Sequence, residues 1–414
     1  MQKNVENNDS DFSLVRVPKN MQLQGLFASM MVLVGFTFFT PSMTAGGQLG
    51  ISMSLNRFML SMILGNAFLG LYCAILSYIG QKTGYNIDIL GSYSLGKKGS
   101  LLSSVIISFT QIGWFGVGVA MFAIPVSSLF HIPMEILIII TGFFMTITAY
   151  FGIGAIAILG TIAVPLIAIL GVYSVNFGIN EVGGIMNVFS NNSTMSLSTG
   201  ISIVVGSFIS GGTSTPNFSR FAKTSNIAII STVVAFFIGN SIMMIFGAVG
   251  GAVTGTPDIF DILIMQGLAI PAVITLGLNI WTTNNNAIYT AGIGVSNITK
   301  KEMKTMILVI GTIGTVLSVW LYNNFVGYLT FLSAIIPPIG AVIILHYFMN
   351  KENYYDENYK KQDVNIYAII SIFIGAFCGF MIKVGIQPIN SLIATAIPYL
   401  IFELLNKSNK NQEN

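Results

Sequence analysis

Residues 35–42 read GFTFFTPS, and they lie inside an apolar segment that carries no charged side chain between positions 20 and 56. Pro41 lacks a backbone donor, and its ring disrupts the interior of a helix. The segment therefore predicts a helix that breaks near its middle. At membrane depth such a break is tolerated only where protein or a cavity satisfies the freed backbone groups. The stretch thus predicts a discontinuous membrane helix beside a functional site.

A second interrupted segment, residues 206–216, reads GSFISGGTSTP. The two segments belong to the first and sixth predicted spans, which are corresponding positions in a chain built from two inverted five-helix repeats. The alternative is that the small residues allow close helix packing, which is common in membrane proteins. The matched positions favour the first interpretation and predict a break in both helices.

The composition excludes a soluble protein. Of the 414 residues, 53% are hydrophobic and 8% are charged, whereas soluble domains carry about 25% charged residues. The mean hydropathy is +0.78. A net charge of +3 provides no basic surface for nucleic acid. Cys73 and Cys378 lie in apolar runs, which is typical of small buried residues. The chain is therefore expected to be a polytopic membrane protein and not an enzyme.

Charge-free gaps mark the candidate spans, because a charge at the bilayer centre costs several kcal/mol. The gaps long enough to hold a helix are 20–56, 58–81, 99–134, 136–180, 182–219, 224–257, 262–299, 305–350, 364–382 and 384–402. Two of them can hold two helices each, with breaks expected at Gly152-Ile153-Gly154 and at Asn323-Asn324. The sequence therefore predicts an all-α fold with twelve transmembrane helices.

The basic residues predict the orientation of these helices. With twelve spans, 16 of the 18 Lys and Arg residues fall on one side, and Arg57 and Lys383 fall on the other. The positive-inside rule then places both termini in the cytoplasm. The expected divisions are a cytoplasmic tail at 1–20, a first repeat of helices 1–5 at 21–178, a second repeat of helices 6–10 at 197–349, helices 11–12 at 364–405, and a cytoplasmic tail at 406–414.

Two further spans carry polar faces. In the eighth span, Asn279, Thr282, Thr283 and Asn286 share one helix face. Their oxygens suit a small hard cation, together with carbonyls freed in the first helix, although hydrogen bonds between helices are the alternative. In the third span, Gln111 and Trp114 share a face with Gly118. Indole, amide and glycine suit a flat heteroaromatic ligand, although a packing Trp is the alternative.

The central parts of the first, third, sixth and eighth spans contain no Asp, Glu, Lys, Arg or His. A charged substrate usually needs a countercharge, and a proton-coupled carrier usually holds an ionisable residue within the membrane. The missing charges therefore favour a neutral substrate and a metal cation as its partner.

Several motifs resemble the nucleobase:cation symporter-1 family. They are TFF-x-x-SM-x-x-GG-x-LG at 37–50, TQIGWFGVGVAMFAIPV at 110–126, VVGSFIS-x-GT at 204–213, LGLNIWTTN-x-NA at 276–287 and WLYNNFVGYLTFLSAIIPP at 320–338. The resemblance covers roughly residues 20–405. It implies the leucine-transporter fold with inverted repeats, alternating access, and a multi-pass protein of the bacterial plasma membrane. The expected activity is import of cytosine with Na⁺, without a cofactor or an obligate protein partner.

The resemblance also implies site residues. The Na⁺ ligands would be the carbonyls of Gly35, Phe38 and Asn279 and the hydroxyls of Thr282 and Thr283. Substrate would lie between Trp114 and Phe208, with polar contacts from Gln111, Asn284 and unwound backbone around Phe39, Thr40 and Ser210. The chain departs from the family at Thr40-Pro41, where Ser-Ala is expected, and Pro41 removes an amide donor.

Other functions remain open at this stage. Uracil, a purine, allantoin or a hydantoin could replace cytosine as the neutral heterocycle, and protons could replace Na⁺. A channel is a further alternative, although two broken helices and an aromatic-flanked pocket favour a binding site. ATP-driven transport lacks support because the chain has no G-x-x-x-x-G-K-[ST] segment.

Overall fold

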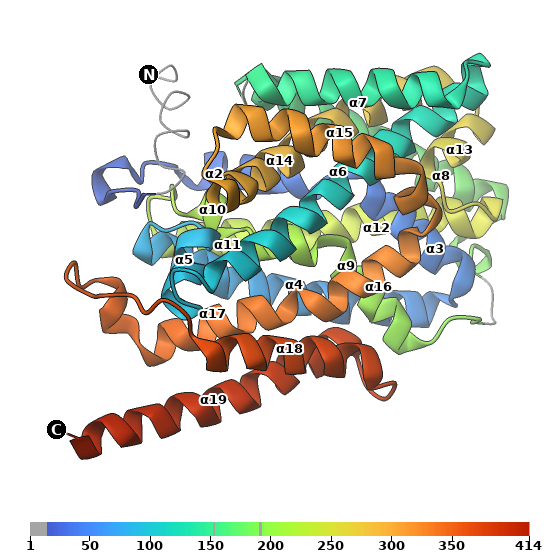
Figure 1. The fold of residues 1–414 in the computed structure, drawn as a ribbon. Coiled ribbons are helices and arrows are strands. Elements are labelled where there is room, and N and C mark those ends of the chain that lie inside the picture. Colours follow the sequence, from blue (N-terminus) through green and yellow to red (C-terminus); the bar gives the residue numbers. More distant parts are fainter. Residues whose placement is uncertain (1–14, 152–153, 190–192, 414) are drawn as a thin grey trace.

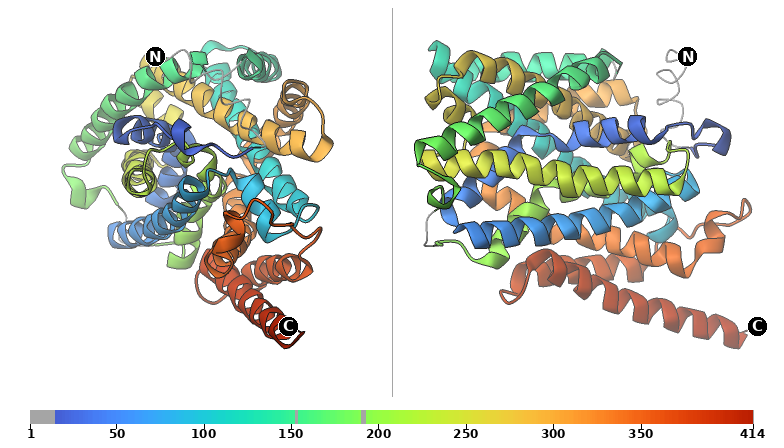
Figure 2. Two further views of the ribbon diagram at one scale, coloured as in Figure 1. Left: turned by 90° about the vertical axis from the view of Figure 1, so that its left-hand side faces the viewer. Right: turned by 180° about the vertical axis from the view of Figure 1, so that it is seen from behind.

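The computed structural model describes residues 15–151, 154–189 and 193–413. The regular secondary structure in this part of the chain is helical, apart from an isolated bridge between Gln24 and Ala222. The long helices run side by side and form one bundle (Figure 1). Two further views show α18 and α19 along one side of it (Figure 2), where they pack on α16 and α17. Most of the buried core therefore lies among the helices before α18.

The helices follow each other in two runs. The first contains η1 (Lys19–Met21), α2 (Leu26–Thr37), α3 (Thr40–Ser52), α4 (Leu55–Thr83), α5 (Ile87–Ser94), α6 (Ser100–Phe130), α7 (Met134–Phe151) and α8 (Gly154–Glu181). The second contains η2 (Ile185–Asn187), α9 (Leu197–Thr213), α10 (Pro216–Ser219), α11 (Ser225–Val233), η3 (Val234–Gly239), α12 (Asn240–Thr254), α13 (Ile259–Met265), α14 (Ala269–Thr299), α15 (Met303–Asn323), α16 (Phe325–Ile335), α17 (Pro337–Met349), η4 (Lys351–Tyr354), α18 (Ile366–Met381) and α19 (Gln387–Glu413).

Eight helices in the described part of the chain are long and apolar enough to cross a membrane. They are α4, α6, α7, Val164–Glu181 of α8, the continuous run α11–η3–α12, α15, the run α16–α17, and Gln387–Asn406 of α19. The bent pair α2 and α3 would make a ninth span. Two long helices are not among these spans: α9, which has 17 residues, and α14, which carries the polar stripe around Asn284. The chain is therefore a multi-span membrane protein.

The predicted break in the first helix is confirmed. Helices α2 and α3 meet at an angle of 53°, with Phe38 and Phe39 between them. Pro41 lies in the first turn of α3, where the missing amide hydrogen costs nothing because those donors have no partner within the helix. Proline therefore starts the second half of the helix immediately after the break.

The prediction for the sixth span is only partly right. Helix α9 continues through Ser210 to Thr213, and the interruption comes later, at Ser214 and Thr215, before α10 begins at Pro216. A Cβ at Gly206 would overlap the backbone of Leu329 on α16. The glycine thus serves close helix packing, which was the alternative interpretation, and the backbone around Ser210 is not unwound.

The two breaks expected inside long apolar gaps have different outcomes. Helix α15 ends at Asn323 and α16 begins at Phe325, so the break at Asn323-Asn324 is confirmed. Residues 152 and 153 of the other break lie outside the described residues, and α7 ends just before them at Phe151.

Helices α3 and α12 pack so closely that Gly247→Ala is expected to destabilise the protein. A Cβ at Gly247 would overlap the carbonyl of Met43, and overpacking of this kind costs about 1–3 kcal/mol. Gly327 on α16 is the matched control, since a Cβ there meets nothing within 4 Å. Thermal unfolding of the purified variants in detergent measures the effect. Equal melting temperatures for the two variants would contradict this account of α3–α12 packing.

Candidate functional site

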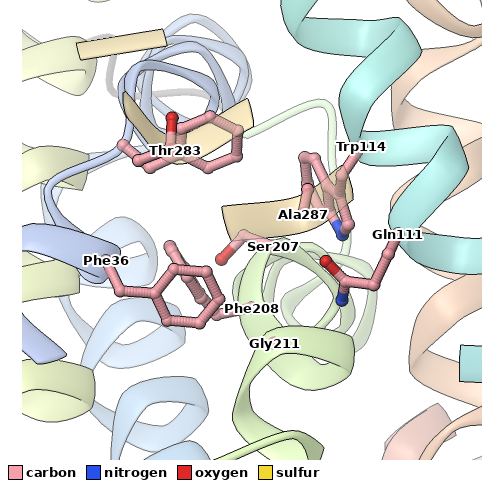
Figure 3. Close-up of a pocket in the computed structure, with 9 residues that line it drawn as sticks. Phe36, Gln111, Trp114, Ser207, Phe208, Gly211, Thr283 and Ala287 are labelled. Atoms are coloured by element: carbon pink, nitrogen blue, oxygen red, sulfur yellow. The ribbon is translucent and has the colours of Figure 1, made fainter. Parts of the chain in front are cut away.

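A small pocket lies beside the break between α2 and α3, where these helices meet α6, α9 and α14 (Figure 3). Its lining is mostly apolar and aromatic, and it consists of Phe36, Phe39, Gln111, Trp114, Ser207, Phe208, Gly211, Thr283 and Ala287. Four of the residues predicted to bind substrate are among them: Phe39, Gln111, Trp114 and Phe208. The structure therefore brings together residues separated by up to 169 positions in the sequence.

Aromatic rings form the walls of this pocket. The Phe39 ring contacts Trp114 and Phe208 edge to face, with ring centroids 5.6 and 6.1 Å apart. Phe36 meets Phe208 in the same way at 5.4 Å. Trp114 and Phe208 are both almost fully buried. Such walls favour a flat ligand, because a flat ring can stack on one aromatic side chain and contact the edges of the neighbouring rings.

Ser210 does not line the pocket, but it holds the side chains of Trp114 and Gln111 in place. Its hydroxyl oxygen accepts a hydrogen bond from the Trp114 indole nitrogen at 2.9 Å and a longer one from the Gln111 amide at 3.4 Å. Figure 3 shows Gln111 reaching from α6 toward α9. The predicted direct contact at Ser210 thus corresponds to a residue that orients Trp114 and Gln111.

Thr40 and Asn284 also lie outside the pocket lining. The amide and the hydroxyl of Thr40 both donate to Oδ1 of Asn279, each at 2.9 Å. The amide of Asn284 donates to the Phe115 carbonyl at 3.0 Å and approaches the Met145 sulfur at 3.2 Å. Thr40 is therefore bonded to Asn279 on α14, and Asn284 packs against α6 and α7.

The break between α2 and α3 frees backbone oxygens. In a continuing helix the Phe39 amide would donate to the Gly35 carbonyl, but here it donates to the Thr37 carbonyl at 2.9 Å. The carbonyl of Phe38 accepts a hydrogen bond from the Asn279 side chain instead of from a following amide. The Gly35 carbonyl has thereby lost its helical donor, and Asn279 bridges the break from α14.

Helix α14 contributes further oxygens beside this break. The Thr282 and Thr283 hydroxyls both donate to the Asn279 carbonyl, at 2.9 and 2.8 Å, and all three residues are buried. Each hydroxyl oxygen keeps lone pairs that can ligate a cation. Hydrogen bonds thus connect Phe38, Asn279, Thr282 and Thr283, and Gly35 on α2 lies about one turn before Phe38. These five residues are called the oxygen cluster. This donor set is neutral and consists of oxygen, which suits a small hard cation.

Comparison with known proteins then identifies the family. Residues 16–395 match the family described as permeases for cytosine/purines, uracil, thiamine, allantoin. The chain belongs to this family. It is 46% identical to the cytosine permease of Escherichia coli K12 over 96% of each chain, and 23% identical to the hydantoin permease of Microbacterium maritypicum over 74% of this permease and 69% of that one. Both relatives are permeases, so the chain is a transporter, and the predicted nucleobase:cation symporter-1 family is confirmed.

Solved structures agree on the fold of this permease. It superposes on Mhp1, a nucleobase-cation-symport-1 family transporter in a closed conformation with bromovinylhydantoin bound, with a TM-score of 0.82, 18% identity and 96% of each chain covered. A Na⁺-coupled sialic acid symporter matches with a TM-score of 0.72, 12% identity, and 98% of this permease and 93% of the other chain covered. The fold is therefore that of Mhp1, as expected for a multi-span protein of the bacterial inner membrane.

Sequence reasoning missed several pocket residues of this permease: Phe36, Ser207, Gly211 and Ala287. Two of them follow from helical spacing, because Gly211 lies four residues after Ser207, and Ala287 lies four residues after Thr283. Thr283 was expected at the cation site alone, but it also lines the pocket. Thr283 therefore connects the pocket with the oxygen cluster.

Proposed function

We propose that this permease imports cytosine together with Na⁺ by alternating access. The main support is the position of Thr283, which lines the aromatic pocket and also donates to the Asn279 carbonyl of the oxygen cluster. A cation held by that cluster would order the end of α2 and the central part of α14. The order of α2 and α14 in turn shapes the pocket, so cation binding and substrate binding are coupled and reciprocal.

The proposal includes a topology of twelve spans with both termini in the cytoplasm. The helix order supports it when α2–α3, α9–α10, α11–η3–α12 and α16–α17 each count as one span. The proposed inverted repeats are residues 21–178 and 197–349. In this division, the interruption after α2 and the interruption after α9 both fall in the first helix of a repeat. The proposed Na⁺ ligands lie at the first of these breaks.

A neutral heterocycle is the proposed class of substrate. The pocket lining contains no ionisable side chain, and a charged ligand would be left without a countercharge. Gln111 supplies an amide, which can offer both a donor and an acceptor to the ring edge. Cytosine is favoured within this class because the curated relatives with 46% identity are cytosine permeases. Uracil, purines, allantoin and hydantoins are the alternatives.

Na⁺ is the proposed coupling ion because the cluster offers neutral oxygens and no group that titrates near neutral pH. Inward movement of one positive charge supplies about 2.3 kcal/mol per 100 mV of membrane potential. Protonation would require an ionisable group in or beside the pocket. Coupling by protons is therefore the second candidate and not the first.

Uptake of radiolabelled cytosine into proteoliposomes tests this function. Saturable uptake that requires an inward Na⁺ gradient is expected, and replacement of Na⁺ by choline should abolish accumulation. Uptake that follows a pH gradient and ignores Na⁺ would replace the sodium proposal with proton coupling. Unsaturable flux would indicate a channel.

Unlabelled uracil is expected to inhibit the uptake of labelled cytosine at least about tenfold less strongly than unlabelled cytosine does. Uracil lacks the exocyclic amine and the ring acceptor of cytosine, so buried polar groups such as the Gln111 amide lose partners at about 1–3 kcal/mol each. Competition with a panel of unlabelled bases in the same proteoliposomes measures the ratio. Equal competition by uracil would mean that the carrier accepts pyrimidines broadly.

A further inference from the structure

A second cavity is lined in part by α5, which lies at one end of the bundle (Figure 1). It lies between α5, the start of α6, the end of α14 and the connection from α17 to α18, and its space of about 1260 Å³ includes the opening to solvent. Its lining is polar and consists of Asp88, Ile89, Ser92, Lys97, Ser100, Asn297, Glu357, Asn358, Tyr359, Lys360 and Lys361. None of these residues lines the substrate pocket.

Lys361 is held firmly at the wall of this cavity. Its ammonium group donates to the Ser92 hydroxyl at 2.8 Å and lies 3.9 Å from the centre of the Tyr93 ring. Tyr93 is itself fixed by stacking, with the Tyr354 ring 4.4 Å away and the Tyr85 ring 5.3 Å away. An ammonium group has three donors, so Lys361 keeps capacity for a ligand while its position is fixed.

The charge at this wall is not neutralised. Among the described residues, neither Lys97 nor Lys361 has a carboxylate within ion-pair distance, whereas the neighbouring Lys98 pairs with Asp363 at 3.1 Å. Burial, followed by the charge of Lys97, lowers the pKa of Lys361 to about 8. Two ammonium groups that repel each other at a cavity wall are a favourable place for an anion.

Neither acidic residue of the lining forms an ion pair with Lys97 or Lys361 in the described part of the chain. The Asp88 carboxylate is buried and accepts a hydrogen bond from the Ser104 hydroxyl on α6, on which α5 packs. Glu357 is exposed. On the opposite wall, Asn297 accepts a hydrogen bond from the Lys300 ammonium at 3.1 Å, which brings another positive charge to the rim.

We propose that this cavity binds a phosphate group, with Lys97 and Lys361 as its charged ligands. A phosphate monoester carries about −1.5 to −2 charges at pH 7 and offers three strong acceptor oxygens, so one group can serve both lysines. A carboxylate has one charge and leaves part of the repulsion in place. The Tyr359 ring, stacked 6.0 Å from Tyr93, gives a flat surface beside the phosphate for a base or an acyl chain.

The phosphate could belong to a soluble compound or to a lipid headgroup, and the experiment separates the two. The full chain is purified in nanodiscs of zwitterionic lipid, and inorganic phosphate and cytidine 5′-monophosphate are titrated by calorimetry. In a second arm, nanodiscs contain phosphatidic acid, whose headgroup is a phosphate monoester, and retained lipid is counted by native mass spectrometry. The proposal requires binding in at least one arm. Absence of binding in both arms would overturn it.

Matched variants locate the site. Lys361→Gln and Lys97→Gln are each expected to weaken binding at least about tenfold, whereas Lys361→Arg, which keeps the charge, should retain it. Lys98→Gln is the control, because Lys98 does not line the cavity and pairs with Asp363. A Lys97→Gln, Lys361→Gln double variant that binds as the wild type would also overturn the proposal. Phosphate binding is measured without transport, so the result is independent of whether cytosine is the substrate.

Discussion

Trp114→Ala is expected to lower the affinity for cytosine about 5- to 150-fold, because aromatic stacking contributes about 1–3 kcal/mol per base. Trp114 is buried at the pocket wall, and its ring centroid lies 5.6 Å from that of the Phe39 ring. Removing the indole takes away the largest flat surface in the lining. It also removes the donor to Ser210, which leaves Gln111 less well oriented. Binding of labelled cytosine to purified protein in nanodiscs measures the change.

A second variant separates stacking from hydrogen bonding. Trp114→Phe keeps a ring but loses the indole nitrogen that donates to Ser210, and a hydrogen bond of this kind contributes about 0.5–1.5 kcal/mol. Its affinity should therefore lie between those of the wild type and Trp114→Ala. Trp320→Ala is the matched control, since Trp320 is 64% exposed on α15. Unchanged cytosine affinity in Trp114→Ala would place the substrate elsewhere.

The helices and the first break could be predicted from the sequence because their signals are local. Charges are excluded from the bilayer core, so gaps between charges mark helices before any packing is known. Pro41 acts on its own backbone, and its effect on the first helix does not depend on neighbours. The same holds for the face that joins Asn279, Thr282 and Thr283, which follows from helical spacing alone.

The continuity of α9 could not be predicted, because glycine has two uses that look alike in sequence. At Gly206 and Gly212 the missing Cβ makes room for neighbours, the Leu329 backbone and the Cys73 sulfur respectively. Those contacts come from α16 and α4, which are far away in the chain. Without the positions of these helices, a packing glycine cannot be distinguished from one that unwinds a helix.

The roles of individual site residues were harder still, because a side chain can turn to a partner that no pattern reveals. Thr40 was expected to contact substrate, but Asn279 draws its amide and hydroxyl to the oxygen cluster. Unwound backbone around Ser210 was expected to contact substrate, but α9 is continuous there, and the Ser210 hydroxyl accepts a hydrogen bond from Trp114. Helical spacing gives the face of a residue, whereas its hydrogen-bond partners depend on the neighbouring helices.

Loss of one hydroxyl at the oxygen cluster is expected to weaken Na⁺ binding about 10- to 150-fold, because interactions of a polar group with a charge contribute about 1.5–3 kcal/mol. Thr282→Val is the cleaner variant, since valine keeps the shape of threonine and Thr282 does not line the pocket. Thr283→Val should weaken Na⁺ binding similarly and also disturb the pocket directly. Cytosine binding across a Na⁺ titration at fixed pH measures both effects.

The controls follow from the coupling between the two sites. In Thr282→Val, cytosine affinity at saturating Na⁺ should return close to the wild-type value, because the cation acts on substrate only through linkage. Thr283→Val should recover incompletely, since Thr283 itself faces the pocket. Thr282→Ser keeps the hydroxyl and should bind Na⁺ nearly as the wild type does. If cytosine binding to the wild type does not respond to Na⁺ at all, the oxygen cluster is a purely structural joint between α2 and α14, and the driving ion must bind elsewhere.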